Sequence, residues 1–130
     1  ELCFVDLVGT EELEVSQLSG GMQKRVAIAR ALAIKPKIIL FDEPTAGLDP
    51  ITSNLIINLV KNVKKLGATS IVVTHTIKNA FEIADRIAVV NGGEIIEIAT
   101  PKDMLNNDNK FIKEFISGES TVSTKSYKCD

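Results

Sequence analysis

Two short runs rich in β-branched residues, at positions 38–41 and 70–74, constrain the fold of this chain more than any other feature. Continuous apolar runs of this length are typical of strands that are buried on both faces of a parallel sheet. A helical pattern follows each run, with apolar residues at positions 51, 55, 59 and 63 (widened by 56, 60 and 66) after the first, and at 77, 80, 81 and 84 after the second. This alternation predicts an α/β fold in which helices flank a parallel sheet.

Glycine and proline residues mark the predicted helix ends in the first third of the chain. Residues 2–8 have the pattern of a short helix that stops at Gly9, and an acidic loop follows. A second helix opens at residues 19–21 and ends before Pro36. Because its residues 26–34 are almost wholly apolar, we expect this helix to be buried on most sides.

The last third of the chain has the pattern of a hairpin followed by helices. Strands are predicted at 86–90 and 94–99, because an Asn-Gly-Gly turn lies between them. Thr100 is placed to cap a helix that begins with Pro101. An amphipathic segment at 111–116 follows, and its apolar face predicts a further packed helix.

Composition excludes several classes of protein. The 130 residues are 45% hydrophobic and 25% charged, which is typical of a soluble globular domain, and no apolar run is long enough to span a bilayer. With 15 basic and 17 acidic residues, the net charge of −2 offers no general footprint for nucleic acid. Cys3 and Cys129 have neither a metal-binding spacing nor a disulfide framework, which favours a reducing compartment.

Chemistry-bearing side chains follow both predicted strands. Asp42 and Glu43 come directly after the first strand, and His75, the only histidine, follows the second. Reactive groups of open α/β sheets collect at the carboxyl ends of the strands. One carboxylate there can hold Mg²⁺ while the other activates a water for nucleotide hydrolysis. A strand that ends in solvated charges, with a structural histidine nearby, is the alternative interpretation.

A serine and two glycines open the second predicted helix. Ser19, Gly20 and Gly21 would let backbone N–H groups and a hydroxyl approach an anion at a helix N-terminus. The alternative is an ordinary serine cap followed by a flexible hinge, which the residues alone leave equally open.

Four motifs together resemble those of the ATP-binding cassette (ABC) ATPases, in that family's order. Residues 18–23, Leu-Ser-Gly-Gly-Met-Gln, resemble the signature motif. Residues 38–43 resemble the Walker B strand, 47–50 the D-loop, and His75 the switch histidine of the H-loop. The resemblance extends over residues 1–116 and implies a partial P-loop NTPase fold, with part of the helical signature subdomain and a C-terminal β-hairpin.

The resemblance implies a role for each residue at the strand ends. Asp42 would lie in the Mg²⁺ shell, and Glu43 would be the general base or would orient the attacking water. His75 would contact the γ-phosphate of ATP. The implied activity is hydrolysis of ATP to ADP and phosphate.

The signature motif implies a composite site between two subunits. Ser19, Gly20, Gly21 and Gln23 would bind a nucleotide held mainly by the second subunit of a homodimer. Asp49 would lie across that dimer interface and link the two sites. An integral membrane permease is the other implied partner, and no nucleic acid is expected.

One family motif is missing from this sequence. No segment reads Gly-x-x-x-x-Gly-Lys-Ser/Thr, the phosphate loop that cradles the β- and γ-phosphates. We therefore expect this sequence to begin mid-protein, to be the C-terminal half of a cassette and to be inactive alone. Residues 1–34 would end the helical subdomain and residues 35–116 would belong to the ATPase core. Residues 117–130 would be a flexible polar tail. Uncovered apolar strands would make it self-associate.

The residue identities in and around the motifs indicate a class of transporter. Residues 18–26 and 41–54 are most similar to Mla-type cassettes of lipid transport, which implies a cytoplasmic subunit, peripheral on the inner face of the bacterial inner membrane. The alternatives are a cassette of another importer, such as one for amino acids or ions, and a non-catalytic truncated fragment that serves interaction or regulation.

Overall fold

A computed structural model describes residues 2–118, which divide into two compact units, Glu1–Ile83 and Ala84–Asp130. The first unit contains η1 (Val15–Gln17), α1 (Gly20–Ala33), β1 (Ile38–Asp42), α2 (Pro50–Lys65), β2 (Thr69–Val73) and α3 (Ile77–Ile83). The second contains β3 (Ile87–Asn91), β4 (Glu94–Ala99), α4 (Pro101–Leu105) and α5 (Lys110–Ser117). The predicted polar tail lies almost wholly in residues 119–130, outside the described residues.

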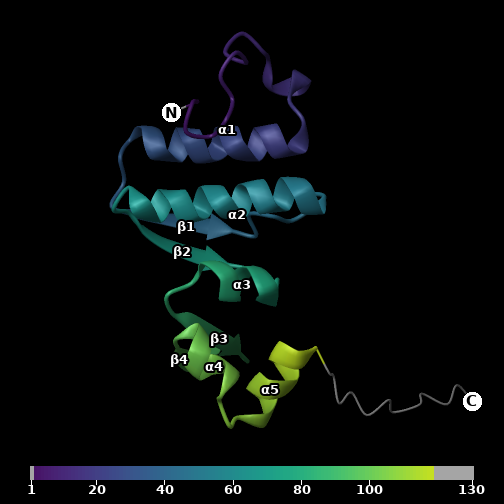
Figure 1. The fold of residues 1–130 in the computed structure, drawn as a ribbon, viewed down its shortest axis with the longest axis vertical. Coiled ribbons are helices and arrows are strands. Elements are labelled where there is room, and N and C mark those ends of the chain that lie inside the picture. Colours follow the sequence, from purple (N-terminus) through teal and green to yellow (C-terminus); the bar gives the residue numbers. More distant parts are fainter. Residues whose placement is uncertain (1, 119–130) are drawn as a thin grey trace, which may run out of the picture. The chain divides into compact units, whose positions relative to one another are not determined.

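The two predicted buried strands pair directly with each other. β1 and β2 are parallel, in a register that runs from Ile38 opposite Thr69 to Asp42 opposite Val73. In Figure 1 their arrows point the same way, toward the beginnings of α1 and α2. The expected α/β arrangement with a parallel sheet is confirmed.

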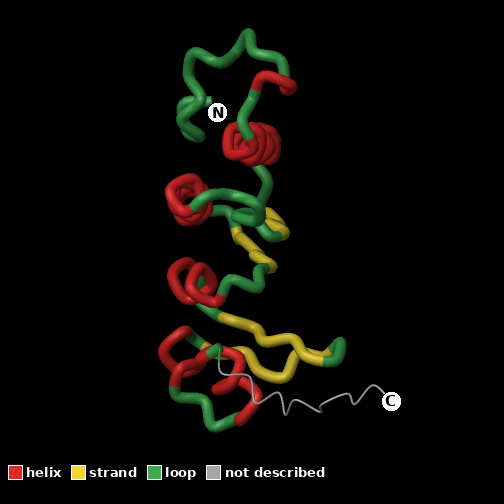
Figure 2. The backbone as a smooth tube through the Cα atoms, turned by 90° about the vertical axis from the view of Figure 1, so that its right-hand side faces the viewer, coloured by secondary structure: helices red, strands yellow, loops and turns green. Residues whose placement is uncertain are grey.

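Helix α2 is the centre of the first unit. It packs against α1 and covers one face of the β1–β2 sheet (Figures 1 and 2). Burial of this helix joins all layers into one core, and burial of apolar area is the main force that stabilises such layers. The buried residues of this core are Val5, Leu7, Ile28, Ala29, Leu32, Ile39, Phe41, Ile56, Leu59, Val60 and Val63.

The buried face of α2 differs from the predicted stripe at its beginning. Ile51 is 77% exposed and Leu55 is also exposed, whereas Ile56 and Val63 are completely buried. Each i, i+4 step advances by about 40° around a helix of 3.6 residues per turn. Positions 63, 59, 55 and 51 therefore drift off the buried face, which instead continues through half-buried Thr52.

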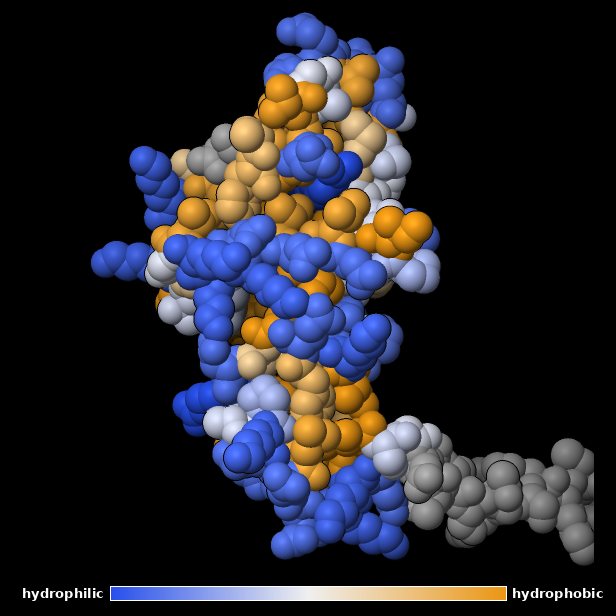
Figure 3. Space-filling model, viewed as in Figure 1, coloured by the Kyte–Doolittle hydropathy of each residue, from blue (hydrophilic) through white to orange (hydrophobic). Residues whose placement is uncertain are grey.

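The prediction that β1 and β2 are buried on both faces is wrong, since alternate residues of each strand are exposed. Ile39 and Phe41 are buried, but Ile38 and Leu40 on the opposite face are 61% and 73% exposed. The reason is that α2 covers one face of the two-stranded sheet, and no described element of this unit covers the other. Apolar side chains also reach the surface on the face seen in Figure 3. Self-association through such surface stays a prediction.

The predicted helix over residues 2–8 is also wrong. This segment is a series of turns in which the N–H of Leu7 donates to the carbonyl of Leu2 at 2.9 Å. Asp6 has a φ of 55°, outside the helical region, and Gly9 at 87° ends the segment. The acidic segment 11–14 lies in turns and loop, as expected, and the one-turn helix η1 follows it.

The second unit confirms the predicted hairpin. β3 and β4 pair antiparallel, with an irregularity between Val89 and Val90. Gly92 and Gly93 both have positive φ, 60° and 85°, which the two-residue turn between right-twisted strands requires. The hydroxyl of Thr100 accepts the N–H of Asp103 and caps α4, as predicted. In the described residues of both units, no helix combines the length and the apolar character needed to cross a membrane.

We predict that Ile56→Ala destabilises the chain by about 2–5 kcal/mol, because it leaves a cavity in the core. The matched variant Ile51→Ala, at the exposed beginning of the same helix, should change stability by less than about 0.5 kcal/mol. Urea denaturation of both variants measures the difference. Equal losses would contradict the buried face of α2 described above.

Candidate functional site

The predicted catalytic side chains meet where β1 and β2 end. The N–H of Glu43 donates to the carbonyl of Val73 at 2.9 Å, which extends the parallel ladder by one step. Glu43 therefore lies beside the residues that follow β2. The sequence separates Glu43 from His75 by 32 positions, and the strand pairing brings them into contact.

The carboxylate of Glu43 accepts hydrogen bonds from Thr74 and His75. The backbone N–H of His75 donates to Oε1 at 2.8 Å, and the ring Nδ1 lies 2.7 Å from the same oxygen. The Thr74 hydroxyl donates to Oε2 at 3.3 Å. The His75 side chain is 81% exposed and that of Glu43 is 30% exposed, so the pair faces solvent while its orientation is fixed.

These contacts lower the pKa of Glu43 below its ordinary value. The largest cause is the hydrogen bond from the His75 side chain, and the His75 N–H, its charge and the Thr74 hydroxyl act in the same direction. Desolvation opposes them but is outweighed. Glu43 is consequently ionised at neutral pH, which is the form that accepts a proton from water.

Asp42 ends β1 as an exposed carboxylate beside this pair. Among the described residues, no cluster of three metal-binding side chains could hold an ion by itself. A Mg²⁺ ion that acts on nucleotides is bound by one or two carboxylates together with phosphate oxygens and water. An exposed carboxylate at a strand end fits that requirement, so Asp42 can contribute to a site that the nucleotide completes.

The predicted anion-binding residues begin α1. Ser19 is the N-cap, and its hydroxyl oxygen accepts the N–H of Met22 at 3.3 Å, which leaves the hydroxyl proton free to donate. Ser19 and Gly20 are exposed. The side-chain amide of Gln23, in contrast, donates to the carbonyls of Val15 and Leu18 at 3.3 and 3.1 Å, so it holds the preceding turn of its own chain.

Gly21 has a packing role that the sequence did not indicate. It is buried, and a Cβ at this position would lie 2.4 Å from Cγ2 of Thr52. The first turns of α1 and α2 therefore approach each other closely. At Gly20 the nearest such atom, on Leu48, is 4.0 Å away, so only the second glycine is required by this contact.

Asp49 caps α2. Its Oδ1 accepts the N–H groups of Ile51 and Thr52, both at 3.0 Å. The hydrogen bond with the Thr52 side chain is the largest of the causes that lower the pKa of Asp49, followed by the backbone bonds. Within this chain Asp49 is thus a helix cap, and its predicted role at a dimer interface stays a prediction.

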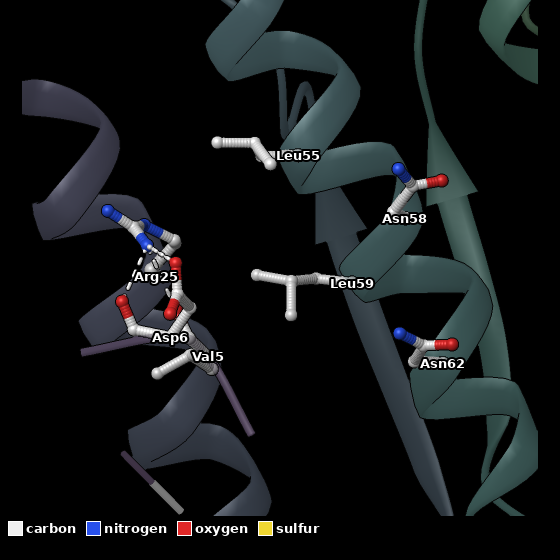
Figure 4. Close-up of a pocket in the computed structure, with 7 residues that line it drawn as sticks. All are labelled: Val5, Asp6, Arg25, Leu55, Asn58, Leu59 and Asn62. Atoms are coloured by element: carbon white, nitrogen blue, oxygen red, sulfur yellow. Dashed lines mark hydrogen bonds and ion pairs between the residues drawn. The ribbon is translucent and has the colours of Figure 1, made fainter. Parts of the chain in front are cut away.

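A pocket elsewhere in the first unit contains none of the predicted site residues. It is lined by side chains of the turn segment, α1 and α2, which are drawn in Figure 4. Nη1 of Arg25 donates to the carbonyls of Val5 and Asp6 at 3.2 and 2.8 Å and lies 3.5 Å from the Asp6 carboxylate. Arg25 therefore fastens the turn segment to α1.

Two contacts at the site were not found from the sequence. The hydroxyl of Thr74 and the ammonium of Lys24 both reach Glu43, the latter at its carbonyl. Lys24 lies beside the signature motif and Thr74 beside His75, but neither residue type carries a signal of such contacts. Only the packing of the elements reveals them.

We predict that His75→Ala raises the pKa of Glu43 toward its ordinary value. Because the folded-state pKa is depressed, ionised Glu43 stabilises the fold above its unfolded pKa of about 4.3, and this contribution is lost as pH falls through the folded-state pKa. The acid-dependent loss of stability should be smaller in the variant, in which the backbone N–H of residue 75 and the Thr74 hydroxyl still bond Glu43. NMR titration of the carboxyl carbons measures the shift, with Glu82, which pairs with Lys61, as the internal control.

Substitution of Gly21 tests the contact between the helices. Gly21→Ala should destabilise the chain by about 1–3 kcal/mol through overpacking against Thr52. Thr52→Ser removes Cγ2, so the double variant should regain most of the loss. The four proteins form a double-mutant cycle in thermal or urea denaturation. Strictly additive effects would mean that the two residues are not in contact.

Three comparisons place the chain among known proteins. Residues 4–46 match the family model described as ABC transporter. The chain is 52% identical over 92 residues to the glutamine transport ATP-binding protein GlnQ of Geobacillus stearothermophilus, which covers 71% of this chain and 38% of that protein. It is 43% identical over 123 residues to the spermidine/putrescine import ATP-binding protein PotA of Clostridium novyi, which covers 93% and 35%. The chain thus spans little more than a third of these relatives' length.

A solved structure gives the same answer for the fold. The ADP conformation of MJ1267, an ATP-binding cassette of an ABC transporter, superposes with a TM-score of 0.77 at 32% identity, over 91% of this chain and 47% of that one. The parallel strands and their helices are therefore part of the P-loop NTPase fold of such cassettes. With the family model and both relatives in agreement, this chain carries part of the ATP-binding cassette of the ABC transporter family.

Proposed function

We propose that this chain supplies the C-terminal half of the ATP-hydrolysing subunit of an ABC transporter. In this proposal residues 1–34 end the helical subdomain and residues 35–116 complete the ATPase core. The observation that carries the proposal is the 2.7 Å contact between Glu43 and His75 at the ends of two adjacent parallel strands. The ATP-binding relatives support it.

Hydrolysis follows from the chemistry of this pair. Ionised Glu43 orients a water molecule and accepts its proton as the water attacks the γ-phosphorus, while the bond from that phosphorus to the β–γ bridging oxygen breaks and ADP leaves. Nδ1–H of His75 donates to the Glu43 carboxylate, so Nε2 can donate to a γ-phosphate oxygen when the imidazole is protonated. Asp42 would hold Mg²⁺ together with the phosphates, and the ion would supply positive charge that neutralises the phosphate oxygens.

The beginning of α1 serves a second subunit. The exposed Ser19 hydroxyl and the N–H groups of Gly20 and Gly21 bind the γ-phosphate of a nucleotide held mainly by a partner cassette. Gln23 supports this loop by fastening the carbonyl of Leu18. In the homodimer Asp49 lies at the interface, close to both composite sites.

The transported solute is proposed from the relatives. GlnQ and PotA are named for glutamine transport and for spermidine/putrescine import, which favours a small polar solute. These relatives do not support the Mla-type lipid assignment. An ATPase of this kind works at the cytoplasmic face of the membrane, bound to an integral membrane permease.

A second candidate function is a non-catalytic fragment that offers only interaction surfaces. One observation favours it: the 130 residues contain no phosphate-loop motif. Without that loop the β- and γ-phosphates lack their main cradle, so this chain alone should bind ATP weakly.

The two candidates separate in one experiment. Mg-ATP turnover is measured for this chain and for an extended chain, translated from about 110 further codons upstream, roughly what a cassette of domain size needs. If the extended chain hydrolyses ATP and the present chain does not, the result supports the proposal that this chain is the C-terminal half of a cassette. Tight nucleotide binding without turnover in the extended chain would favour the non-catalytic candidate.

We predict that Glu43→Gln in the extended chain preserves ATP binding and lowers turnover by about 10²- to 10⁴-fold, because the general base is lost. The matched control is Glu82→Gln on α3, a carboxylate that also accepts a side-chain hydrogen bond but lies outside the site. The control should retain full turnover. Unchanged turnover in Glu43→Gln would show that Glu43 is not the base.

A further inference from the structure

Lys24 reaches from α1 to the backbone of the proposed catalytic base. Its Nζ donates to the carbonyl oxygen of Glu43 at 3.2 Å, in a partly buried contact between residues 19 positions apart. Lys24 lies one turn after Gly20 and Gly21, on the helix whose N-terminus is proposed to face a phosphate. It belongs to none of the motifs that the sequence identified.

Glu43 needs such a contact because its backbone is strained. Its φ is 42°, in the left-handed region that residues other than glycine rarely adopt. Its N–H is held by the carbonyl of Val73 at 2.9 Å, and its carbonyl accepts the N–H of Ala46 at 3.1 Å as well as Lys24. Of these bonds, the one from Lys24 alone comes from α1.

The next turn is anchored independently. Thr45 is buried, and its hydroxyl accepts the side-chain amide of Asn79 on α3 at 3.1 Å. The segment that follows Glu43 is therefore fixed from the α3 side, while the Glu43 peptide is fixed from the α1 side. The two anchors together restrain the backbone on which the Glu43 carboxylate is carried.

We propose that Lys24 is a positioning residue that holds Glu43 in its strained conformation and couples it to the phosphate-facing end of α1. The proposal rests on the function proposed above, in which Glu43 activates water. Because the end of α1 serves the partner's nucleotide and Glu43 serves the chain's own, Lys24 links the two sites through one side chain. Its ammonium needs no contact with nucleotide for this role.

The kinetic test uses Lys24→Met and Lys24→Arg in the extended chain. Lys24→Met removes the donor and should lower kcat by about 10- to 100-fold through displacement of the base, with little change in KM for ATP. Lys24→Arg keeps a donor and should recover most of the activity. Lys65→Met is the charge-matched control, because Lys65 is exposed on the same helix as its hydrogen-bond partner Asn62, α2, and has no contact with the site among the described residues. Combined with Glu43→Gln, Lys24→Met should cause no further loss.

A second measurement needs no turnover. In the present chain, Lys24→Met should shift the NMR resonance of the Glu43 carbonyl carbon, and Lys65→Met should not. An unshifted carbonyl resonance, an unchanged kcat, or a further loss in the Glu43→Gln background would each overturn the role of Lys24. Absence of turnover in the unsubstituted extended chain would instead overturn the proposed function.

Discussion

The parallel pairing of β1 with β2 is the interaction on which the candidate site depends. Its register places Asp42 opposite Val73, so that Glu43 and His75 leave the sheet side by side. A shift of one residue would turn every side chain to the other face. Such a shift would turn Ile39 and Phe41 out of the core and the Asp42 carboxylate into it, and burial of an unpaired charge is costly. The apolar core thereby sets the geometry of polar groups that lie outside it.

Helix α2 connects the packed sheet to the signature motif at the beginning of α1. Its middle forms the core, while its first turn, capped by Asp49, presents Thr52 to Gly21. The close approach of the two helices brings Lys24 within reach of the Glu43 carbonyl. Side chains proposed to serve two different nucleotides are thus held by one packed layer, which offers a direct physical route between the sites.

Much of the local structure was predictable from sequence, because local chemistry decides it. The hairpin follows from two adjacent glycines with positive φ, and α4 from the cap at Thr100. The turn segment was not predictable in this way, because Asp6 adopts a left-handed conformation that its residue type permits but does not demand. The exposed face of β1 escaped prediction for a different reason: an apolar run does not say which elements cover it.

By itself, the sequence determined the α/β class, the parallel strands and the identity of the polar residues that follow them, because these depend on residue type and short-range spacing. The tertiary structure decided that the Glu43 carboxylate meets His75 and Thr74, that Gly21 packs against Thr52, and that Lys24 holds the base. Such contacts join residues many positions apart. They arise only when packed layers bring backbones within a few ångströms, which no local pattern encodes.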